Sequence, residues 1–176
     1  MEESEEKTQE EAKPCGFFVR KGRVRFRQME PSDLEEIMTI ERASFSYPWS
    51  AGFFLQELRV PCARSLVAVV EGKTAGYVIY WLLPSEVDVH NLAVHPAYRR
   101  QGVGRSLLCA VIDDARRRGS CRVTLEVRKS NEAAQRLYQS LGFVAKGVRR
   151  GYYSDDGEDA VTMMLEVERY SPPDGC

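Results

Sequence analysis

Hydrophobic and polar positions along this 176-residue chain follow two periods, and the period changes from one stretch to the next. Alternation at every second residue predicts strands, whereas apolar residues three or four positions apart predict helices. The resulting order, β-α-α-β-β-β-α-β-α-β-β, predicts a single α/β layer domain without an internal repeat. Strands are expected at about residues 23–29, 64–70, 75–83, 86–94, 121–128, 143–150 and 160–167, and helices at about 31–45, 49–58, 102–118 and 131–142.

Several of these elements have a clear buried side. In the strand at 121–128, Val123, Leu125 and Val127 point one way, so Glu126 points the other way and can face a cleft. The helix that begins near Gly102 and stops at Gly119 is expected to bury Val103, Leu107, Val111 and Ala115. The following helix has Asn131 as its cap, Gly142 at its end and a stripe of Ala134, Leu137, Tyr138 and Leu141.

Composition supports one ordinary hydrophobic core. Hydrophobic residues make up 43% of the chain and aromatic residues 10%, which suits a single domain of this length. The longest apolar run, residues 77–83, is far shorter than the roughly 18 to 20 residues of a membrane helix. The opening MEESEEKTQEEAKP does not resemble a secretory signal. We therefore expect a cytoplasmic location and no membrane partner.

The five cysteines lie far apart, with no Cys-x-x-Cys pair and no histidine at metal-ligand spacing. Such spacing favours reduced thiols and argues against a metal site.

Charge is unevenly distributed along the chain. Residues 1–14 hold six Glu and two Lys, a net −4, whereas the remainder has 23 basic and 20 acidic residues, a net +3. A segment with this much charge cannot bury enough apolar surface to fold into an ordered structure. We expect an acidic flexible tail over residues 1–20, a folded domain over 21–168 and a flexible C-terminus over 169–176. The near-neutral body gives no general footprint for nucleic acid.

The segment HPAYRRQGVGRSLL, residues 95–108, places glycines and arginines just ahead of a helical pattern. Unpaired N–H groups at a helix start, together with the helix dipole, form an anion-binding device. The glycine spacing fits neither the P-loop nor the dinucleotide fingerprint. It does fit Gln/Arg-x-x-Gly-x-Gly/Ala, with Arg99, Gly102 and Gly104 at the defined positions.

That pattern is the acetyl-CoA-binding signature of the GNAT superfamily of N-acetyltransferases. Over about residues 23–167 the chain resembles the RimI branch, which acetylates protein N-termini. The resemblance implies the GNAT fold, a mixed and mostly antiparallel central sheet of about seven strands flanked by about four helices, with acetyl-CoA as co-substrate and no metal. The matching segments are YPWS (47–50), NLAVHPAYRRQGVGRSLL (91–108), LEVRKSNEAAQRLYQSLGF (125–143) and RRGYYSDDGEDAVTMML (149–165).

Two catalytic roles follow from the resemblance. Glu126 is the implied general base, acting through a water, and Tyr138 is the implied acid that protonates the departing CoA thiolate. Other interpretations remain open from the residues alone. Glu126 also suits an ion pair with a nearby Arg or Lys, and Tyr138 suits a purely structural place in the buried stripe of its helix.

The resemblance also implies the cofactor contacts. The strand at 86–94 is expected to splay from its neighbour, which frees backbone groups for the pantetheine arm and one N–H to polarise the thioester carbonyl. The implied cofactor residues are Leu92, Ala93, Val94, Arg99, Arg100, Gln101, Gly102, Val103, Gly104, Arg105, Ser106, Asn131 and Tyr138.

The acceptor is expected between the YPWS and GYY segments, with contacts from Tyr47, Pro48, Trp49, Asn91, Tyr152 and Tyr153. The aromatic residues among them equally suit packing. The acidic turn at 154–159, with Asp155, Asp156, Glu158 and Asp159, either attracts a basic peptide or is merely solvated.

The implied activity is transfer of acetyl to the N-terminal alanine of a small-subunit ribosomal protein. An α-amino group has a pKa about 2.5 units below that of a lysine side chain, so a weaker base can deprotonate it. One alternative is acetylation of lysine side chains or small amines by the same residues. Another is a non-catalytic acetyl-CoA-binding module, although Glu126 and Tyr138 are both present.

Overall fold

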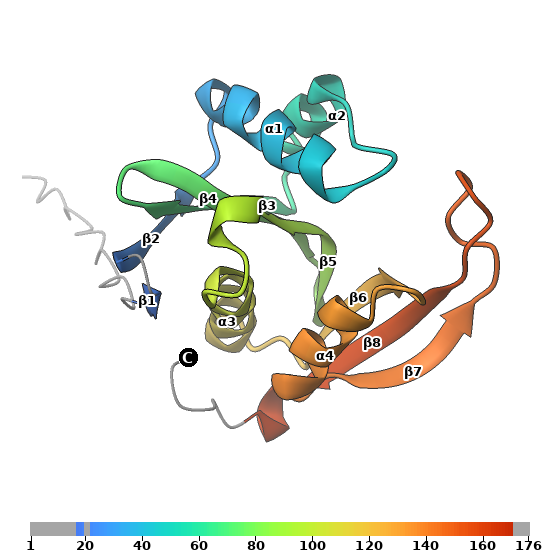
Figure 1. Ribbon diagram of the computed structural model, residues 1–176. Coiled ribbons are helices and arrows are strands. Elements are labelled where there is room, and N and C mark those ends of the chain that lie inside the picture. Colours follow the sequence, from blue (N-terminus) through green and yellow to red (C-terminus); the bar gives the residue numbers. More distant parts are fainter. Residues whose placement is uncertain (1–16, 20–21, 171–176) are drawn as a thin grey trace, which may run out of the picture.

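The structure, a computed structural model, describes residues 17–19 and 22–170, which form one sheet with helices on both faces (Figure 1). The strands are β1 (Phe17–Val19), β2 (Gly22–Gln28), β3 (Ala63–Val70), β4 (Lys73–Leu82), β5 (Glu86–Val94), β6 (Arg122–Arg128), β7 (Val144–Arg149) and β8 (Ala160–Glu166). The α-helices are α1 (Leu34–Ser44), α2 (Ala51–Glu57), α3 (Val103–Arg117) and α4 (Glu132–Ser140). Short 3-10 turns occupy η1 (Pro31–Asp33), η2 (Pro96–Tyr98) and η3 (Val167–Arg169).

The strand order is β1-β2-β3-β4-β5-β6-β8-β7, and only the β5–β6 pair is parallel among the described strands. The mixed, mostly antiparallel sheet with four flanking α-helices confirms the expected fold. The sheet has eight strands instead of about seven, because β1 pairs with β2. Alternation cannot be read in a strand of three residues, so the sequence pattern did not predict β1.

Both expected domain boundaries fall beside ordered structure. β1 lies within the segment expected to be a tail, although residues 1–16 are outside the described part of the chain. At the other end, Tyr170 is 6% exposed and its carbonyl accepts a 2.9 Å hydrogen bond from Arg116. Tyr170 thus packs against the domain, and the rest of the expected C-terminal tail lies outside the described residues.

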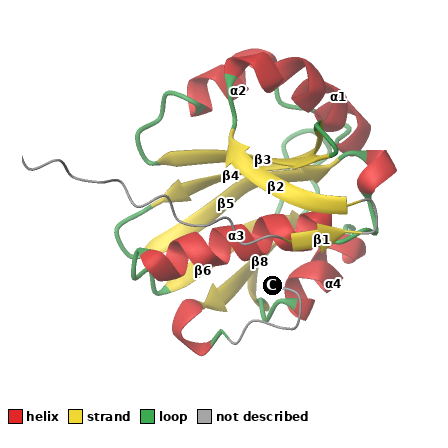
Figure 2. Cartoon of the chain, turned by 90° about the vertical axis from the view of Figure 1, so that its left-hand side faces the viewer, coloured by secondary structure: helices red, strands yellow, loops and turns green. Residues whose placement is uncertain are grey.

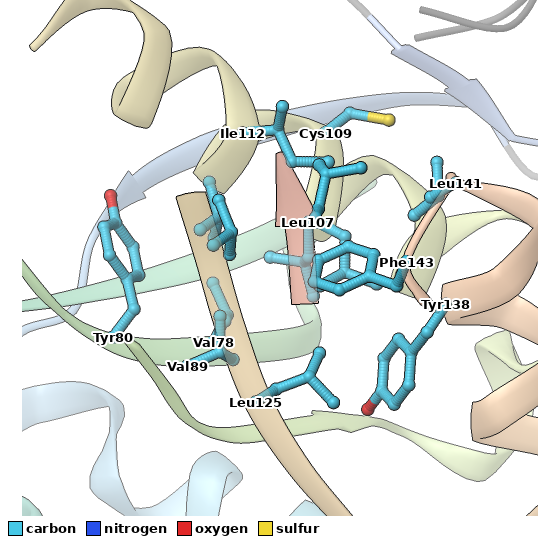
Figure 3. Packing of buried hydrophobic residues seen from close by; sticks show 14 of the residues in the cluster. Val78, Tyr80, Val89, Leu107, Cys109, Ile112, Leu125, Tyr138, Leu141 and Phe143 are labelled. Atoms are coloured by element: carbon cyan, nitrogen blue, oxygen red, sulfur yellow. The ribbon is translucent and has the colours of Figure 1, made fainter. Parts of the chain in front are cut away.

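Helices α1 and α2 cover one face of the sheet, while α3 and α4 cover the other (Figure 2). The buried side of α3 is the one expected, formed by Val103, Leu107, Val111 and Ala115 with their neighbours. Leu107 lies among side chains from β4, β5 and β6, with Phe143 beside it (Figure 3). Burial of one such side chain contributes about 1.5–3 kcal/mol.

The expected ends of α3 and α4 are confirmed. Asn131 accepts an N-terminal capping hydrogen bond at α4, and Gly119 and Gly142 have the positive φ values expected after α3 and α4. Ser50 caps α2 in the same way as Asn131 caps α4. No helix in the described ranges is long and apolar enough to cross a membrane.

Cysteine pairing departs in part from the expectation. Cys62 and Cys121 are free, whereas Cys109 is disulfide-bonded. The expectation of reduced thiols is therefore wrong for Cys109, because pairing depends on which cysteines the fold brings together and not on their spacing in the chain.

Candidate active site

Strands β5 and β6 part in the middle of the sheet. Their parallel register ends at Val89 and Leu125, although both strands continue beyond it. At the same level β5 holds an extra residue, His90, which opposes no residue of β4. A bulge of this kind bends its strand. The expected splay is present, and Leu92, beyond the end of the pairing, lines a cavity.

Glu126 follows the last paired residue of β6. Because Leu125 and Val127 are buried in the cluster under α3, Glu126 faces the side of α1 and α2. Its side chain is 16% exposed, and its Oε1 atom lies 3.3 Å from Nη2 of Arg149. Burial raises the pKa of the Glu126 carboxyl, an effect that Arg149 opposes and Asp88 reinforces. A carboxylate with a raised pKa is a stronger base than an ordinary one.

Tyr138 projects from α4. It is 9% exposed, and its ring packs on Phe143 with the centroids 6.0 Å apart. Figure 3 shows the Tyr138 hydroxyl pointing away from Phe143. Burial, with a smaller contribution from Tyr153, raises the pKa of Tyr138 to about 12. The hydroxyl is therefore protonated near neutral pH and has a proton to donate, while the ring occupies the place expected of a core residue.

A cavity of about 630 Å³ brings the two candidate catalytic residues together. Its walls come from α1 and the segment after it, from β5 and β6 where they part, from α4, and from the loop between β7 and β8. Besides Glu126 and Tyr138, its lining includes the predicted residues Leu92, Asn131, Tyr47, Trp49, Asn91, Tyr152 and Tyr153. Residues expected to bind cofactor and residues expected to bind acceptor thus share one space.

The turn between β5 and α3 contains two residues in the left-handed backbone region. Gly102, the N-cap of α3, has a φ of 93°, and Arg100 has a φ of 59°, both in the left-handed region. The first hydrogen bond of the helix runs from the Ser106 amide to the Gly102 carbonyl, at 2.9 Å. The helix itself therefore does not use the amides of Val103–Arg105, which point toward its N-terminal end.

The start of α3 lies beside β5 and α4. A Cβ atom at Gly104 would lie 3.4 Å from Leu137 and 3.5 Å from Val94. These are ordinary van der Waals distances, so alanine would also fit at this position, in agreement with the Gly/Ala of the pattern.

Arg99 makes contacts inside the protein that the sequence did not reveal. Its guanidinium donates to the carbonyls of Val94 and Ala43, at 3.0 and 3.1 Å, and to the Ser44 hydroxyl at 3.0 Å. These hydrogen bonds tie the turn to the ends of β5 and α1. The structure therefore gives Arg99 a role in shaping the turn.

Three other predicted cofactor residues also contact the protein itself. The Gln101 amide donates to a carbonyl earlier in the turn, at 2.8 Å. Arg105 donates to Ser140 of α4 at 2.9 Å. Ser106 is 4% exposed, and its hydroxyl donates to carbonyls of the preceding helical turn. The backbone amides are the groups of this turn best placed for an anion.

On the acceptor side, Trp49 is partly buried and packs on Phe53 and Phe54, with ring centroids 4.4 and 5.6 Å away. Tyr47 and Tyr152 are 63% and 45% exposed. Pro48 is exposed and does not line the cavity. A smaller cavity of about 300 Å³ lies next to Glu126, lined also by Trp49, Asp88, Val89, His90, Tyr152 and Tyr153.

Glu41 is a site residue that sequence reasoning missed. It is 1% exposed and lines the large cavity. The Trp49 amide donates to it at 2.8 Å, the Tyr77 hydroxyl also donates to it, and the Asn91 amide lies 3.4 Å away. Burial raises the pKa of the Glu41 carboxyl, and these donors oppose the rise. A glutamate within a helical pattern gives no sign that its partners lie 8 to 50 residues away.

Residues 34–143 match the Acetyltransferase (GNAT) family. The chain is 38% identical over 141 residues to the Escherichia coli [ribosomal protein bS18]-alanine N-acetyltransferase, covering 79% of this chain and 95% of that protein. It is 42% identical over 123 residues to the N-alpha-acetyltransferase RimI of Mycobacterium tuberculosis, covering 68% and 76%. The crystal structure of the E. coli ribosomal-protein-S18-alanine N-acetyltransferase has a TM-score of 0.75, with 35% identity over 87% of this chain and 98% of that one. The expected relationship is therefore confirmed, and this chain belongs to the GNAT family of acetyltransferases.

Proposed function

We propose that this protein transfers the acetyl group of acetyl-CoA to the α-amino group of a protein N-terminus. The expected acceptor is the N-terminal alanine of a small-subunit ribosomal protein, since the E. coli relative is named for that reaction on protein bS18. The observation that carries the proposal is the presence of Glu126 and Tyr138 in one cavity at the parting of β5 and β6.

The residues present fit acetyl-CoA. The N-terminal amides of α3 and its dipole suit the pyrophosphate, and the edge of β5 at Leu92–Val94 suits the amide groups of the pantetheine arm. Asn131 both caps α4, through a 3.1 Å hydrogen bond from Ala134, and lines the cavity, so its two expected uses are compatible. When bound, acetyl-CoA supplies a thioester with an electrophilic carbonyl carbon and a thiolate leaving group.

The chain's own residues handle the protons. Glu126, with its raised pKa, takes a proton from the incoming ammonium group through a water. Tyr138, protonated at neutral pH, gives a proton to the departing sulfur. An α-amino group loses its proton about 2.5 pKa units more readily than a lysine side chain, so a carboxylate base suits an N-terminal acceptor better.

A panel of peptides incubated with the protein and acetyl-CoA, and analysed by mass spectrometry, tests this proposal. The panel varies the first residue, and matched peptides carry a blocked N-terminus or have every internal lysine replaced by arginine. We expect acetylation of a free N-terminal alanine that blocking abolishes and that lysine replacement leaves intact. Acetylation of the lysines would support the alternative substrate class. Binding of acetyl-CoA without any peptide reaction would contradict the proposed acceptor.

A further inference from the structure

The loop between β7 and β8, residues 150–159, carries two of the three tyrosines predicted on the acceptor side, Tyr152 and Tyr153, and four acidic residues. We infer that Arg128 is a positioning residue that clamps this loop against the cavity, so that acceptor binding depends on a residue that need not touch the acceptor. The inference rests on the proposed function, because it assigns the residue that holds the proposed acceptor site in place.

Arg128 contacts three carboxylates of the loop. Its Nη2 atom lies 2.5 Å from Asp155, and its Nη1 atom lies 2.9 Å from Asp156 and 3.0 Å from Glu158. The Arg128 side chain is 25% exposed and that of Asp155 is 11% exposed. A guanidinium presents five N–H donors in a fixed plane, so one arginine can serve several carboxylates in this way.

The same guanidinium also holds an aromatic ring. The Cζ atom of Arg128 lies 3.9 Å from the ring centroid of Tyr153, a cation–π contact. Tyr153 lines both cavities beside Glu126, and it contributes to the raised pKa of Tyr138. Arg128 therefore determines where a side chain next to both candidate catalytic residues lies.

Arg128 is itself attached to the catalytic framework. It ends β6, two positions after Glu126, and its carbonyl accepts a 3.1 Å hydrogen bond from Gln135 of α4. The clamp thus connects the loop to the elements that carry Glu126 and Tyr138.

Other hydrogen bonds also attach the β7–β8 loop to the segment that follows β6. The Ser130 amide donates to Glu158 at 2.7 Å, and the Lys129 amide donates to the Asp159 carbonyl at 3.1 Å. The Asp159 carboxylate accepts from the Gly151 amide at 3.0 Å. The acidic residues therefore make contacts within the protein, a use that the sequence interpretations of peptide attraction and solvation did not include.

Loss of the guanidinium would leave Asp155, Asp156 and Glu158 close together without their shared cation. Like charges at short range repel one another, and a loop that loses several such contacts opens more readily. Opening would displace Tyr153 from the acceptor side, while the turn before α3 lies on other elements and would keep its shape. The effect is therefore expected in acceptor binding and not in acetyl-CoA binding.

The test compares Arg128→Met and Arg128→Lys with Lys129→Met, a matched control that removes the neighbouring positive charge. Lys129 is 66% exposed and lies 3.9 Å from Asp159. Hydrogen–deuterium exchange of residues 150–159 measures how readily the loop opens, and it needs no substrate. Steady-state kinetics with an N-terminal alanine peptide and calorimetry with acetyl-CoA report the two binding steps.

For Arg128→Met we expect faster exchange across the loop and a peptide KM raised about 10-fold or more, with the acetyl-CoA Kd within about 2-fold of wild type. Arg128→Lys should fall in between, because an ammonium is a single point charge. The double variant Arg128→Met/Asp155→Asn should have nearly the same peptide KM as Arg128→Met alone, since the two residues act through one shared contact. Lys129→Met should have the loop exchange rate, the peptide KM and the acetyl-CoA Kd of the wild type.

Unchanged exchange in Arg128→Met would overturn the clamp, and so would an equal loss of acetyl-CoA and peptide binding. If the wild-type protein modifies no N-terminus at all, the proposed function fails. The exchange experiment then still decides the clamp, with faster exchange supporting it and unchanged exchange contradicting it.

Discussion

The Glu126 carboxylate lies 3.3 Å from the guanidinium of Arg149. An ion pair and a general base were alternative interpretations of this glutamate, and the structure combines the features of both in one side chain. Burial raises the pKa of Glu126 more than Arg149 lowers it. The ion pair therefore moderates the basicity of the carboxylate without removing it.

Replacement of this carboxylate by an amide tests the base directly. For Glu126→Gln we expect kcat to fall by about 10²- to 10⁴-fold, because a positioned base contributes about that much. The residual activity should shift to higher pH, where the amine is already deprotonated. Acetyl-CoA affinity, measured by calorimetry, should stay the same.

Glu132→Gln is the matched control for that variant, since Glu132 is 76% exposed on α4 and pairs only with Arg136 among the described residues. Equal losses of acetyl-CoA affinity and turnover in Glu126→Gln would argue against the base assignment.

Removal of Arg149 and removal of Asp88 should shift the pH dependence of kcat in opposite directions, because the two residues carry opposite charges next to Glu126. Arg149 lowers the pKa of Glu126 and Asp88 raises it. A base is active when deprotonated, so Arg149→Met should shift the acidic limb of the kcat profile to higher pH and Asp88→Asn should shift it to lower pH. Use of one peptide keeps the titration of the substrate amine the same in all profiles. Shifts in the same direction would show that Glu126 does not set this limb.

Tyr138→Phe removes the proposed acid and keeps the buried ring. We expect a fall in kcat of about 10²-fold or more, with little change in thermal stability, because the ring still packs on Phe143. Thermal unfolding and steady-state kinetics measure the two effects on one sample. Full activity in Tyr138→Phe would leave the residue with a structural role alone.

Gly102→Val should prevent acetyl-CoA binding. Gly102 has a φ of 93°, a conformation that is costly for a β-branched residue, and a side chain there would crowd the turn whose amides we propose as the pyrophosphate site. Calorimetry should detect no binding in this variant. Gly147→Ala is a suitable control, since no atom lies within 4 Å of the added Cβ. Wild-type affinity in Gly102→Val would refute the assignment of the turn.

Glu41→Ala should disrupt the buried hydrogen bonds that support the proposed acceptor site. It removes the acceptor of the Tyr77 hydroxyl and of the Trp49 amide, and each buried donor left without a partner costs about 1–3 kcal/mol. We expect a lower Tm and a higher peptide KM. Glu35→Ala, at an exposed position of the same helix, should change neither quantity. A normal peptide KM would show that Glu41 serves stability only.

Local pattern predicted much of this protein. The alternation in β6 correctly placed Glu126 opposite the core residues Leu125 and Val127, because side chains of a strand alternate between its two faces. The glycines of the turn before α3 were recognised because their spacing matches the acetyl-CoA-binding signature. Both features depend on residues within about one or two turns of each other, which a sequence displays directly.

Other features depend on residues that are distant in the chain. Glu41 meets Tyr77 and Asn91 across 36 and 50 residues, and Arg128 meets the β7–β8 loop across 27 to 30 residues. The bulge at His90 likewise appears only in the register with β4. No periodicity identifies such partners, because a polar residue in a local pattern has the same appearance whether it faces solvent or a buried partner.

The sequence by itself therefore determined the order of the elements from β2 onward, their buried faces and the turn that suits an anion, since these are visible in patterns of nearby residues. Only the tertiary structure decided that β5 and β6 part beside Glu126, that Arg99 is used within the turn and that the acidic loop is held by Arg128. Those features arise when the sheet brings distant segments together, and their energies depend on burial and on neighbouring charges that exist only in the folded chain.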